Sequence, residues 1–479
     1  MFSPELMRAF EDFKRVWDPD GRMNPHKLID PYPLDTHLRE GAGYRTLPLK
    51  TVFTYPKDDR SFAAAAERCF GVGACRHTDG GVMCPSFMVT REEKHSTRGR
   101  ARLMQEMVRA SGPVEKKWRS REVKESLDLC LACKGCRGDC PVRVDIATYK
   151  AEFLHHHYKR RLRPRQAYAL GLINLWARLA SHAPRLANTL THAPAVRAVV
   201  KAAGGVAQQR DVPRFARQSF AEWFAGHSPR DPEAPPVLLW PDTFTNYFSP
   251  EIGRDAVTVL EAAGYRVVLP SGALCCGRPL YDYGMLTLAR RYLRRVLDDL
   301  RPLITAGVPL VGLEPSCLAV FRDELTNVFP DDDDAARLHA QSFVLAEFLT
   351  EHARDWPVPR LHRKALVQPH CHHHAVIGFD SEQNLLEQMG LDVEMADAGC
   401  CGMAGSFGYE AGERYDVSIA AGERVLLPKV REAAEDTLVL ADGFSCRSQI
   451  SSGTSRDGLH LAQVLALAIQ QGQSGGMHS

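Results

Sequence analysis

The chain has no long apolar segment and almost no excess of charge of either sign. None of its apolar runs approaches the roughly 20 residues that a membrane-spanning helix needs. The 60 Lys and Arg residues nearly balance the 58 Asp and Glu residues, for a formal net charge of +2, which favours neither a nucleic acid nor an acidic partner. The first residues lack the apolar region of a signal peptide. We therefore expect a soluble, cytoplasmic protein that at most contacts the inner face of a membrane peripherally.

Common phosphate-binding and catalytic motifs are missing as well. The sequence contains no G-x-x-x-x-G-K-[ST] loop, and no G-x-G-x-x-G follows a predicted strand. The G-V-G-A stretch at Gly71 lies between cysteines and is better explained as part of a metal-binding loop. No Ser–His–Asp triad or pair of carboxylates stands out, so the sequence predicts no catalytic residue.

Cysteine, by contrast, is abundant. The 14 cysteines of this 479-residue chain gather in short motifs and doublets, unlike the even spread of a secreted disulfide framework. This distribution indicates metal ligation in a reducing compartment. The length suits two or three domains with buried cores.

The densest cysteine motif, C-L-A-C-K-G-C-R-G-D-C-P, begins at Cys130. Its C-x2-C-x2-C-x3-C-P spacing is typical of bacterial ferredoxins, in which three thiolates bind one cubane and the fourth binds a different cluster. A zinc ribbon would instead show two separated C-x2-C pairs. The sequence therefore predicts a [4Fe–4S] cluster. Its ligands are Cys130, Cys133, Cys136 and, from an earlier Cys-Pro pair, Cys84.

A second cluster is predicted less completely. Cys140 is expected to join Cys69 and Cys75, whose C-x5-C-x8-C-P motif leaves this set one cysteine short. Three alternatives stay open: a three-iron cluster, a non-cysteine ligand such as His77 or Asp79, or no second cluster.

The pattern of the sequence divides the chain into five segments. Residues 1–60 form an amphipathic helix and a Pro-rich tail, and residues 61–157 hold the cluster motifs among helices. Residues 158–235 are basic and helical. From residue 236 onward strands and helices alternate, as in α/β proteins. The predicted fold is multidomain α+β: an α-helical ferredoxin domain, then a duplicated α/β domain with repeats at 236–330 and 331–479.

The duplication is visible as an internal alignment. Residues 236–317 align with residues 365–446, and each copy contains a Cys-Cys-Gly doublet. The second copy has four cysteines: Cys371, Cys400, Cys401 and Cys446. The first copy has Thr243 in place of the early cysteine, and it keeps Cys275, Cys276 and Cys317. The acidic run at 331–334 opens the connection between the copies and is predicted to be a solvated turn.

These doublets resemble the cysteine-rich (CCG) domain shared by the iron–sulfur subunits of glycolate oxidase, anaerobic glycerol-3-phosphate dehydrogenase and heterodisulfide reductase. The resemblance implies that each repeat brings its cysteines to one site at the strand ends. Four thiolates can hold zinc or a further iron–sulfur cluster, whereas three leave an open position. His370, next to Cys371, is a further candidate ligand.

The first 60 residues resemble the closing helix and tail of flavin-linked oxidases. The shared pattern is F-x-x-F-K followed by D-P-x-G-x-x-N-P-G-K, with His26 in place of the usual Gly. Together with the cysteine motifs, this resembles the C-terminal iron–sulfur portion of FAD-linked D-2-hydroxyglutarate or D-lactate dehydrogenases. It implies FAD in a partner subunit or a missing N-terminal domain, and an electron acceptor such as a quinone or an electron carrier.

Electron transfer is the leading functional hypothesis. A flavin would oxidise a D-2-hydroxy acid, and the clusters would pass the electrons singly to the acceptor. The alternative is a thiol/disulfide oxidoreductase like heterodisulfide reductase, with catalysis at the Cys-Cys-Gly site. A metal-stabilised interaction scaffold is a third hypothesis. The basic segment 158–235 fits contact with an anionic membrane, contact with an acidic partner face, or a solvated linker bundle.

Overall fold

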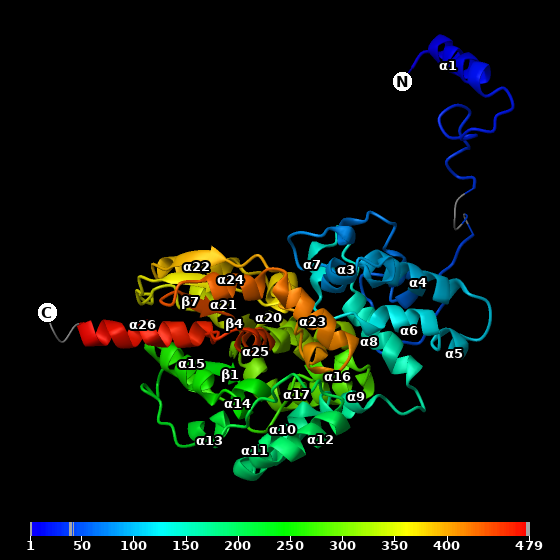
Figure 1. Ribbon diagram of the computed structural model, residues 1–479. Helices are drawn as coiled ribbons and strands as arrows, with labels where there is room; N and C mark the ends of the chain where they lie inside the picture. The colour runs from blue at the N-terminus through cyan, green and yellow to red at the C-terminus, as the bar shows by residue number, and fades with distance from the viewer. Residues whose placement is uncertain (1, 38–40, 42, 476–479) are drawn as a thin grey trace. The chain divides into compact units, whose positions relative to one another are not determined.

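A computed structural model describes residues 2–37, 41 and 43–475. These residues form two compact units that divide between Leu47 and Pro48. The first unit contains the predicted amphipathic helix, α1 (Pro4–Trp17; Figure 1), which begins where the Ser3 side chain accepts a hydrogen bond from the Leu6 N–H group. In the part of the chain that is described, no helix combines the length and apolar character needed to cross a membrane.

The first part of the second unit consists of short helices around the cysteine motifs. A Ser or Asp side chain caps four of these helices, so polar residues fix where they begin. The elements are α2 (Phe62–Glu67), η1 (Ala74–Arg76), α3 (Pro85–Thr90), η2 (Glu93–His95), α4 (Thr97–Arg109), α5 (Val114–Lys117), α6 (Arg121–Asp128), α7 (Gly135–Asp139) and α8 (Ile146–His157).

The basic segment that follows is largely helical. Proline occupies the first turn of two of its helices, where a missing N–H group costs no hydrogen bond. Gly205, with a left-handed φ of 69°, ends the second of these helices. The elements are α9 (Arg165–Ala169), α10 (Ile173–Ser181), α11 (Pro184–His192), α12 (Pro194–Gly204) and α13 (Phe220–Phe224).

Two small parallel sheets come next, with strand orders β2-β1-β3-β4 and β6-β5-β7. In each, the first strand lies between the next two, which is the arrangement expected of parallel strands joined by helices. The strands are β1 (Pro236–Trp240), β2 (Arg266–Val268), β3 (Leu310–Gly312), β4 (Ser342–Val344), β5 (Lys364–Val367), β6 (Asp392–Met395) and β7 (Leu438–Leu440). β4 joins the first sheet although it follows residue 330, the predicted end of the first repeat.

The two sheets share one apolar core. Val237 and Leu239 of β1, Ala365 and Val367 of β5, and residues of the last helix belong to a single buried cluster. The surrounding elements are α14 (Thr243–Tyr247), α15 (Pro250–Ala262), α16 (Arg278–Asp282), α17 (Leu286–Thr305), α18 (Pro315–Ala319), η3 (Val320–Glu324), α19 (Leu325–Val328), α20 (Asp333–Ala340), α21 (Leu345–His352), η4 (His373–Ile377), α22 (Asp380–Gln388), η5 (Phe407–Tyr409), α23 (Glu413–Glu423), α24 (Leu426–Glu432), α25 (Phe444–Gly453) and α26 (Leu461–Gly475).

The acidic run at residues 331–334 differs from its prediction. It starts a helix instead of forming a solvated turn. The Asp332 side chain accepts hydrogen bonds from the N–H groups of Asp334 and Ala335, and α20 begins there. Carboxylates are favoured in the first turn because they complement the helix dipole.

A buried charge cluster connects the ferredoxin-type motif to the first sheet. The Lys134 ammonium lies 3.2 Å from an Asp145 oxygen and 3.1 Å from a Glu324 oxygen, and it also contacts Asp323. Burial alone would lower the pKa of Lys134, but the surrounding carboxylates raise it above the ordinary lysine value. Arg278 binds the same Glu324 over 2.7 Å. The loop and the helices after β3 are therefore held together by opposite charges.

Replacing Lys134 by Met should destabilise the protein by about 3–5 kcal/mol, because Asp145 and Asp323 would stay buried without their ammonium partner. Urea unfolding of anaerobically purified protein measures the change. Arg121→Met is the matched control, since Arg121 is exposed and pairs with its helix neighbour Glu125, so the cost should stay below about 1 kcal/mol. Equal stability of the two variants would contradict this role for Lys134.

Candidate metal centres

The four predicted ligands of the first cluster meet at one small buried cavity. Its walls include Cys84, Cys130, Cys133 and Cys136, and all four are buried free thiols. Local backbone geometry brings them there. Cys84 has a left-handed φ of 59°, after which Pro85 starts α3.

This donor set fits a [4Fe–4S] cluster, because four cysteine sulfurs around one cavity are the usual ligands of such a cluster. The backbone also supports anionic sulfurs. The Thr97 N–H group donates to Cys84 Sγ over 2.8 Å, and the Ile146 N–H group donates to Cys136 Sγ over 3.4 Å. Burial raises the pKa of Cys84 and of Cys136 well above that of an ordinary thiol, and these hydrogen bonds act in the opposite direction because they favour the thiolate form. Arg100 lines the same cavity.

The second predicted set is brought together only in part. Burial raises the pKa of Cys69, and the nearby thiols of Cys75 and Cys140 add to this effect. The Cys84 side chain lies close to Cys75 of this second set, and its interaction lowers the pKa of Cys75 to about 6. The two alternative ligands, His77 and Asp79, are exposed. Asp79 lines a separate surface hollow.

Both Cys-Cys-Gly doublets fold in the same way. Gly277 and Gly402 have left-handed φ angles of 81° and 88°. Their N–H groups donate to the first sulfur of each doublet, Cys275 and Cys400, each over 3.4 Å. A Cβ atom at Gly402 would lie 2.2 Å from the Ser418 carbonyl oxygen, so only glycine fits there.

The four cysteines of the second repeat form one buried group. Cys446 donates a hydrogen bond to Cys401 over 3.5 Å, and Cys400 contacts both Cys371 and Cys401. Hydrogen bonds from Cys400 and Cys446 hold the pKa of Cys401 well below that of an ordinary thiol. Four converging sulfurs, one of them favoured as thiolate, suit zinc or an iron–sulfur cluster.

The first repeat brings three thiols together with a hydroxyl group. Cys276 Sγ lies 3.0 Å from Cys317 Sγ. Thr243, which replaces the early cysteine, donates from Oγ1 to Cys275 Sγ over 3.8 Å. Burial raises the pKa of Cys276 well above its usual value. All of these residues line a large pocket, so this site is open on one side.

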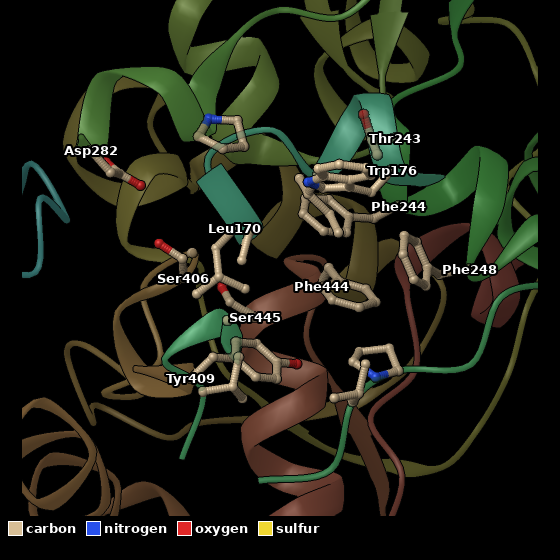
Figure 2. Close-up of a pocket in the computed structure, with 18 of the residues that line it drawn as sticks. Leu170, Trp176, Thr243, Phe244, Phe248, Asp282, Ser406, Tyr409, Phe444 and Ser445 are labelled. Carbon is tan, nitrogen blue, oxygen red and sulfur yellow. The ribbon is translucent and has the colours of Figure 1, made fainter. Parts of the chain in front are cut away.

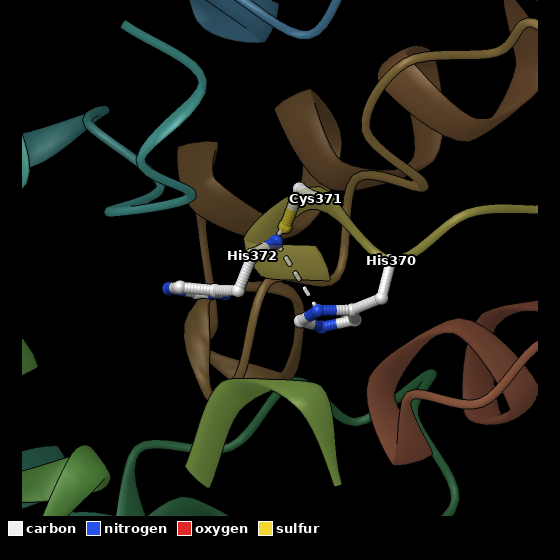
Figure 3. A group of neighbouring side chains, drawn as sticks. All are labelled: His370, Cys371 and His372. Atoms are coloured by element: carbon white, nitrogen blue, oxygen red, sulfur yellow. Dashed lines mark hydrogen bonds between the residues drawn. The ribbon is translucent and has the colours of Figure 1, made fainter. Parts of the chain in front are cut away.

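His370, the predicted additional ligand, lies beside Cys371 (Figure 3). One potential ligand atom from each of His370, Cys371 and His372 falls within 4.8 Å of the other two, and all three residues are buried. The His372 N–H group donates to His370 Nδ1 over 3.2 Å, and Ser445 Oγ lies 3.4 Å from His370 Nε2. Both ring nitrogens therefore have partners within the protein.

A further buried group has no counterpart among the sequence-based predictions. Potential ligand atoms of His373, Glu382 and Asp442 also lie within 4.8 Å of one another. Burial raises the pKa of Glu382 well above its ordinary value, and burial lowers the pKa of His373 to about 4, so both groups are held neutral. Among these residues only His373 belongs to a recognisable motif, the histidine run, and Asp442 lies far from it in sequence.

The ferredoxin-type site and the second-repeat site adjoin. Cys133 and Cys400 lie close enough for each thiol to shift the pKa of the other. Both residues belong to a buried cluster that also contains Leu131 and Phe407. The backbones approach closely as well, since a Cβ atom at Gly138 would lie 3.0 Å from the Ala375 Cα. No motif in the chain indicates this contact.

Comparison with known families identifies three matched regions. Residues 65–144 match the 4Fe-4S dicluster domain, residues 242–322 match the cysteine-rich domain, and residues 1–28 match the C-terminal domain of FAD linked oxidases. These matches confirm a 4Fe–4S domain and, within the first repeat, a cysteine-rich domain.

Related proteins agree with these matches. The chain is 28% identical to D-2-hydroxyglutarate dehydrogenase of Pseudomonas putida, over 96% of this chain and 49% of the relative. It is 26% identical to the Escherichia coli protein of the same name, over 97% of this chain and 49% of the relative. A subunit of the anaerobic glycerol-3-phosphate dehydrogenase of Escherichia coli is 28% identical over 59% of this chain and 72% of the relative. The chain spans about half the length of these two D-2-hydroxyglutarate dehydrogenases.

Substituting Gly443 by Ala tests the packing around His370. A Cβ atom there would lie 2.1 Å from His370 Cδ2, so the ring must move and stability should fall by about 1–3 kcal/mol. Gly472→Ala is the control, because a Cβ atom at Gly472 meets no atom within 4 Å. Thermal unfolding compares them. Similar melting temperatures would show that the ring is not confined as described.

Proposed function

We propose that this chain is the iron–sulfur electron-transfer part of a flavin-dependent D-2-hydroxyacid dehydrogenase. FAD, in a partner subunit or a preceding domain, would supply the two-electron oxidation of the hydroxy acid to the oxo acid. This chain would carry the electrons onward, one at a time, to an acceptor such as a quinone. The observation that supports this most strongly is the contact between Cys133 and Cys400, which joins two candidate metal centres through adjacent sulfurs.

The proposed roles follow from the donor sets. The ligands of the first [4Fe–4S] cluster are Cys84, Cys130, Cys133 and Cys136. The partial ligands of a second cluster are Cys69, Cys75 and Cys140. The ligands of a further cluster or of zinc are, in the second repeat, Cys371, Cys400, Cys401 and Cys446, with His370 as an additional candidate. In the first repeat they are Cys275, Cys276 and Cys317.

The surroundings of the first cluster suit electron transfer better than direct reaction with a substrate at the protein surface. Its thiols are buried, and cationic side chains lie close to them. Arg100 lines the cavity, and buried Lys150 donates to the Cys130 carbonyl oxygen. Positive charge near an anionic thiolate cage stabilises its reduced state and raises the reduction potential.

A flavin-binding partner is supported by the first unit. Its helix α1 exposes a row of large apolar side chains, with Phe13 67%, Val16 75% and Trp17 68% exposed. Exposed apolar patches of this kind mark interaction surfaces. The match of residues 1–28 to the C-terminal domain of FAD linked oxidases favours a flavin domain as the element that covers them.

A thiol/disulfide oxidoreductase is the second candidate. It is favoured by one observation, the pocket onto which Cys275, Cys276 and Cys317 open. Disulfide reduction needs a thiol that a substrate can reach. Under this alternative, the reduced protein would cleave a disulfide substrate, and Cys276→Ala would abolish that reaction without loss of the first cluster.

Iron, sulfide and zinc analysis of anaerobically purified variants tests the proposed electron path. The unaltered chain should contain about four to eight irons and show a reduced-cubane EPR signal after dithionite treatment. Cys136→Ala should lose about four irons and most of this signal. Cys69→Ala should keep the first signal and lose iron only if a second cluster is present.

Cys275→Ala is the comparison variant for the first cluster only, because it alters a proposed ligand of the first repeat and no thiol of the ferredoxin-type motif. It should leave the EPR signal of the first cluster unchanged. A chain that contains zinc but no reducible iron would refute the electron-transfer proposal and favour the metal-stabilised scaffold.

A further inference from the structure

A large apolar pocket lies between helices α9–α12 and the cysteines of the first repeat, and Figure 2 shows part of its lining. Its volume is about 670 Å³, which suits a small organic molecule. Cys275, Cys276 and Cys317 form part of its wall, and Leu131 and Ala132 of the ferredoxin-type loop form another part. The pocket therefore reaches the first cluster loop as well as the first-repeat thiols.

The pocket contains an aromatic group suited to a flat ring. Phe244 and Phe444 stack with ring centres 4.4 Å apart and planes 16° apart, and the Phe248 ring lies 5.9 Å from that of Phe444. Figure 2 shows these rings on the pocket wall, with the hydroxyl groups of Thr243 and Ser445 in the same lining. Aromatic faces bind planar rings by offset stacking, and a few hydroxyl groups can donate to carbonyl oxygens.

The mouth of the pocket lies on the basic helical segment. Trp176, Leu190 and Val200 line the pocket, and they are also 45%, 49% and 39% exposed. A lining residue that is half exposed marks where the pocket opens. The opening therefore lies among α10, α11 and α12.

The surface around this opening is apolar and cationic. Residues 165–204 contain no Asp or Glu. Exposed apolar side chains on these helices are Leu175, Leu179, Leu186, Val196 and Val199. Exposed arginines on α9–α12 are Arg165, Arg178, Arg185 and Arg197, of which Arg197 also pairs with Asp211 over 3.6 Å. Apolar side chains combined with arginines suit the interface of an anionic membrane, where each basic group adds about 1 kcal/mol of attraction.

We propose that this pocket binds a lipid-soluble quinone, which reaches it from an anionic membrane surface contacted by α10–α12. This assignment rests on the electron-transfer function proposed above. The bound quinone would take the two electrons that the hydroxy acid loses on oxidation to the oxo acid, delivered singly through the neighbouring iron–sulfur sites. It would also take two protons from solvent, and leave as the quinol.

Binding can be measured without any electron donor. A water-soluble short-chain ubiquinone is titrated into the oxidised, cluster-loaded chain by calorimetry. Saturable binding is expected. Ala180→Phe should weaken it about tenfold or more, because Ala180 lines the pocket and the larger side chain would occupy ligand space. The matched control is Ala202→Phe, on an exposed position of α12 outside the lining, which should leave the affinity unchanged.

Three results would overturn the quinone assignment. They are the absence of saturable binding, equal affinity in both variants, and displacement of the quinone by a saturated fatty acid that binds equally well. Iron content and EPR of the same samples separate this failure from failure of the electron-transfer proposal. A chain without reducible iron refutes the function, whereas a chain with normal clusters and no quinone binding refutes only the pocket assignment.

The membrane route has its own test. The chain should sediment with vesicles of phosphatidylcholine and phosphatidylglycerol, and less with phosphatidylcholine alone or in high salt. Replacing Arg178 and Arg185 together by Glu should reduce binding to the anionic vesicles, whereas Arg121→Glu on α6 should not. Equal sedimentation with both kinds of vesicle would overturn the membrane route.

Discussion

The Lys134 ammonium is completely buried among carboxylates, and the arrangement of the candidate metal centres depends on that pairing. Lys134 follows Cys133 directly, so neutralising its charge fixes the cysteine loop against Asp323 and Glu324. An isolated buried charge would cost far more than any nearby packing could offset. Arg278 binds the same Glu324, and only Gly277 separates it from Cys276. One acidic segment therefore positions both the ferredoxin-type loop and the first doublet.

This arrangement explains how two regions of different architecture can share the proposed electron path. Once the loop is fixed, Cys133 and Cys400 lie together in one buried apolar cluster. Close-packed interiors yield little to rearrangement, so the sulfurs stay adjacent. The glycines of the doublets also hold sulfurs in place. Their left-handed backbone directs the N–H groups of Gly277 and Gly402 toward the Cys275 and Cys400 sulfurs.

Much of the fold and of the site can be predicted because the signals are local. Cysteine spacing indicates the ligands at Cys130–Cys136, and strand patterns indicate the sheets. The acidic run at 331–334 is an exception, because its charge suggests a solvated turn whereas Asp332 caps a helix. The Cys133–Cys400 contact, the Glu382 group and the pocket could not be predicted, since each joins residues that lie far apart in the chain.

The difference between the two repeats gives the proposed path a direction. In the second repeat Cys371 completes a closed set of four sulfurs beside the ferredoxin-type site. In the first repeat Thr243 stands in that place, and its hydroxyl group lies 3.8 Å from Cys275 on the pocket wall. A fourth thiolate there would complete the site, as it does in the other copy. The threonine instead leaves three sulfurs open toward a ligand. In the proposed path, the second repeat is therefore suited to exchange electrons with the ferredoxin-type site, and the first repeat is suited to deliver them to a bound acceptor.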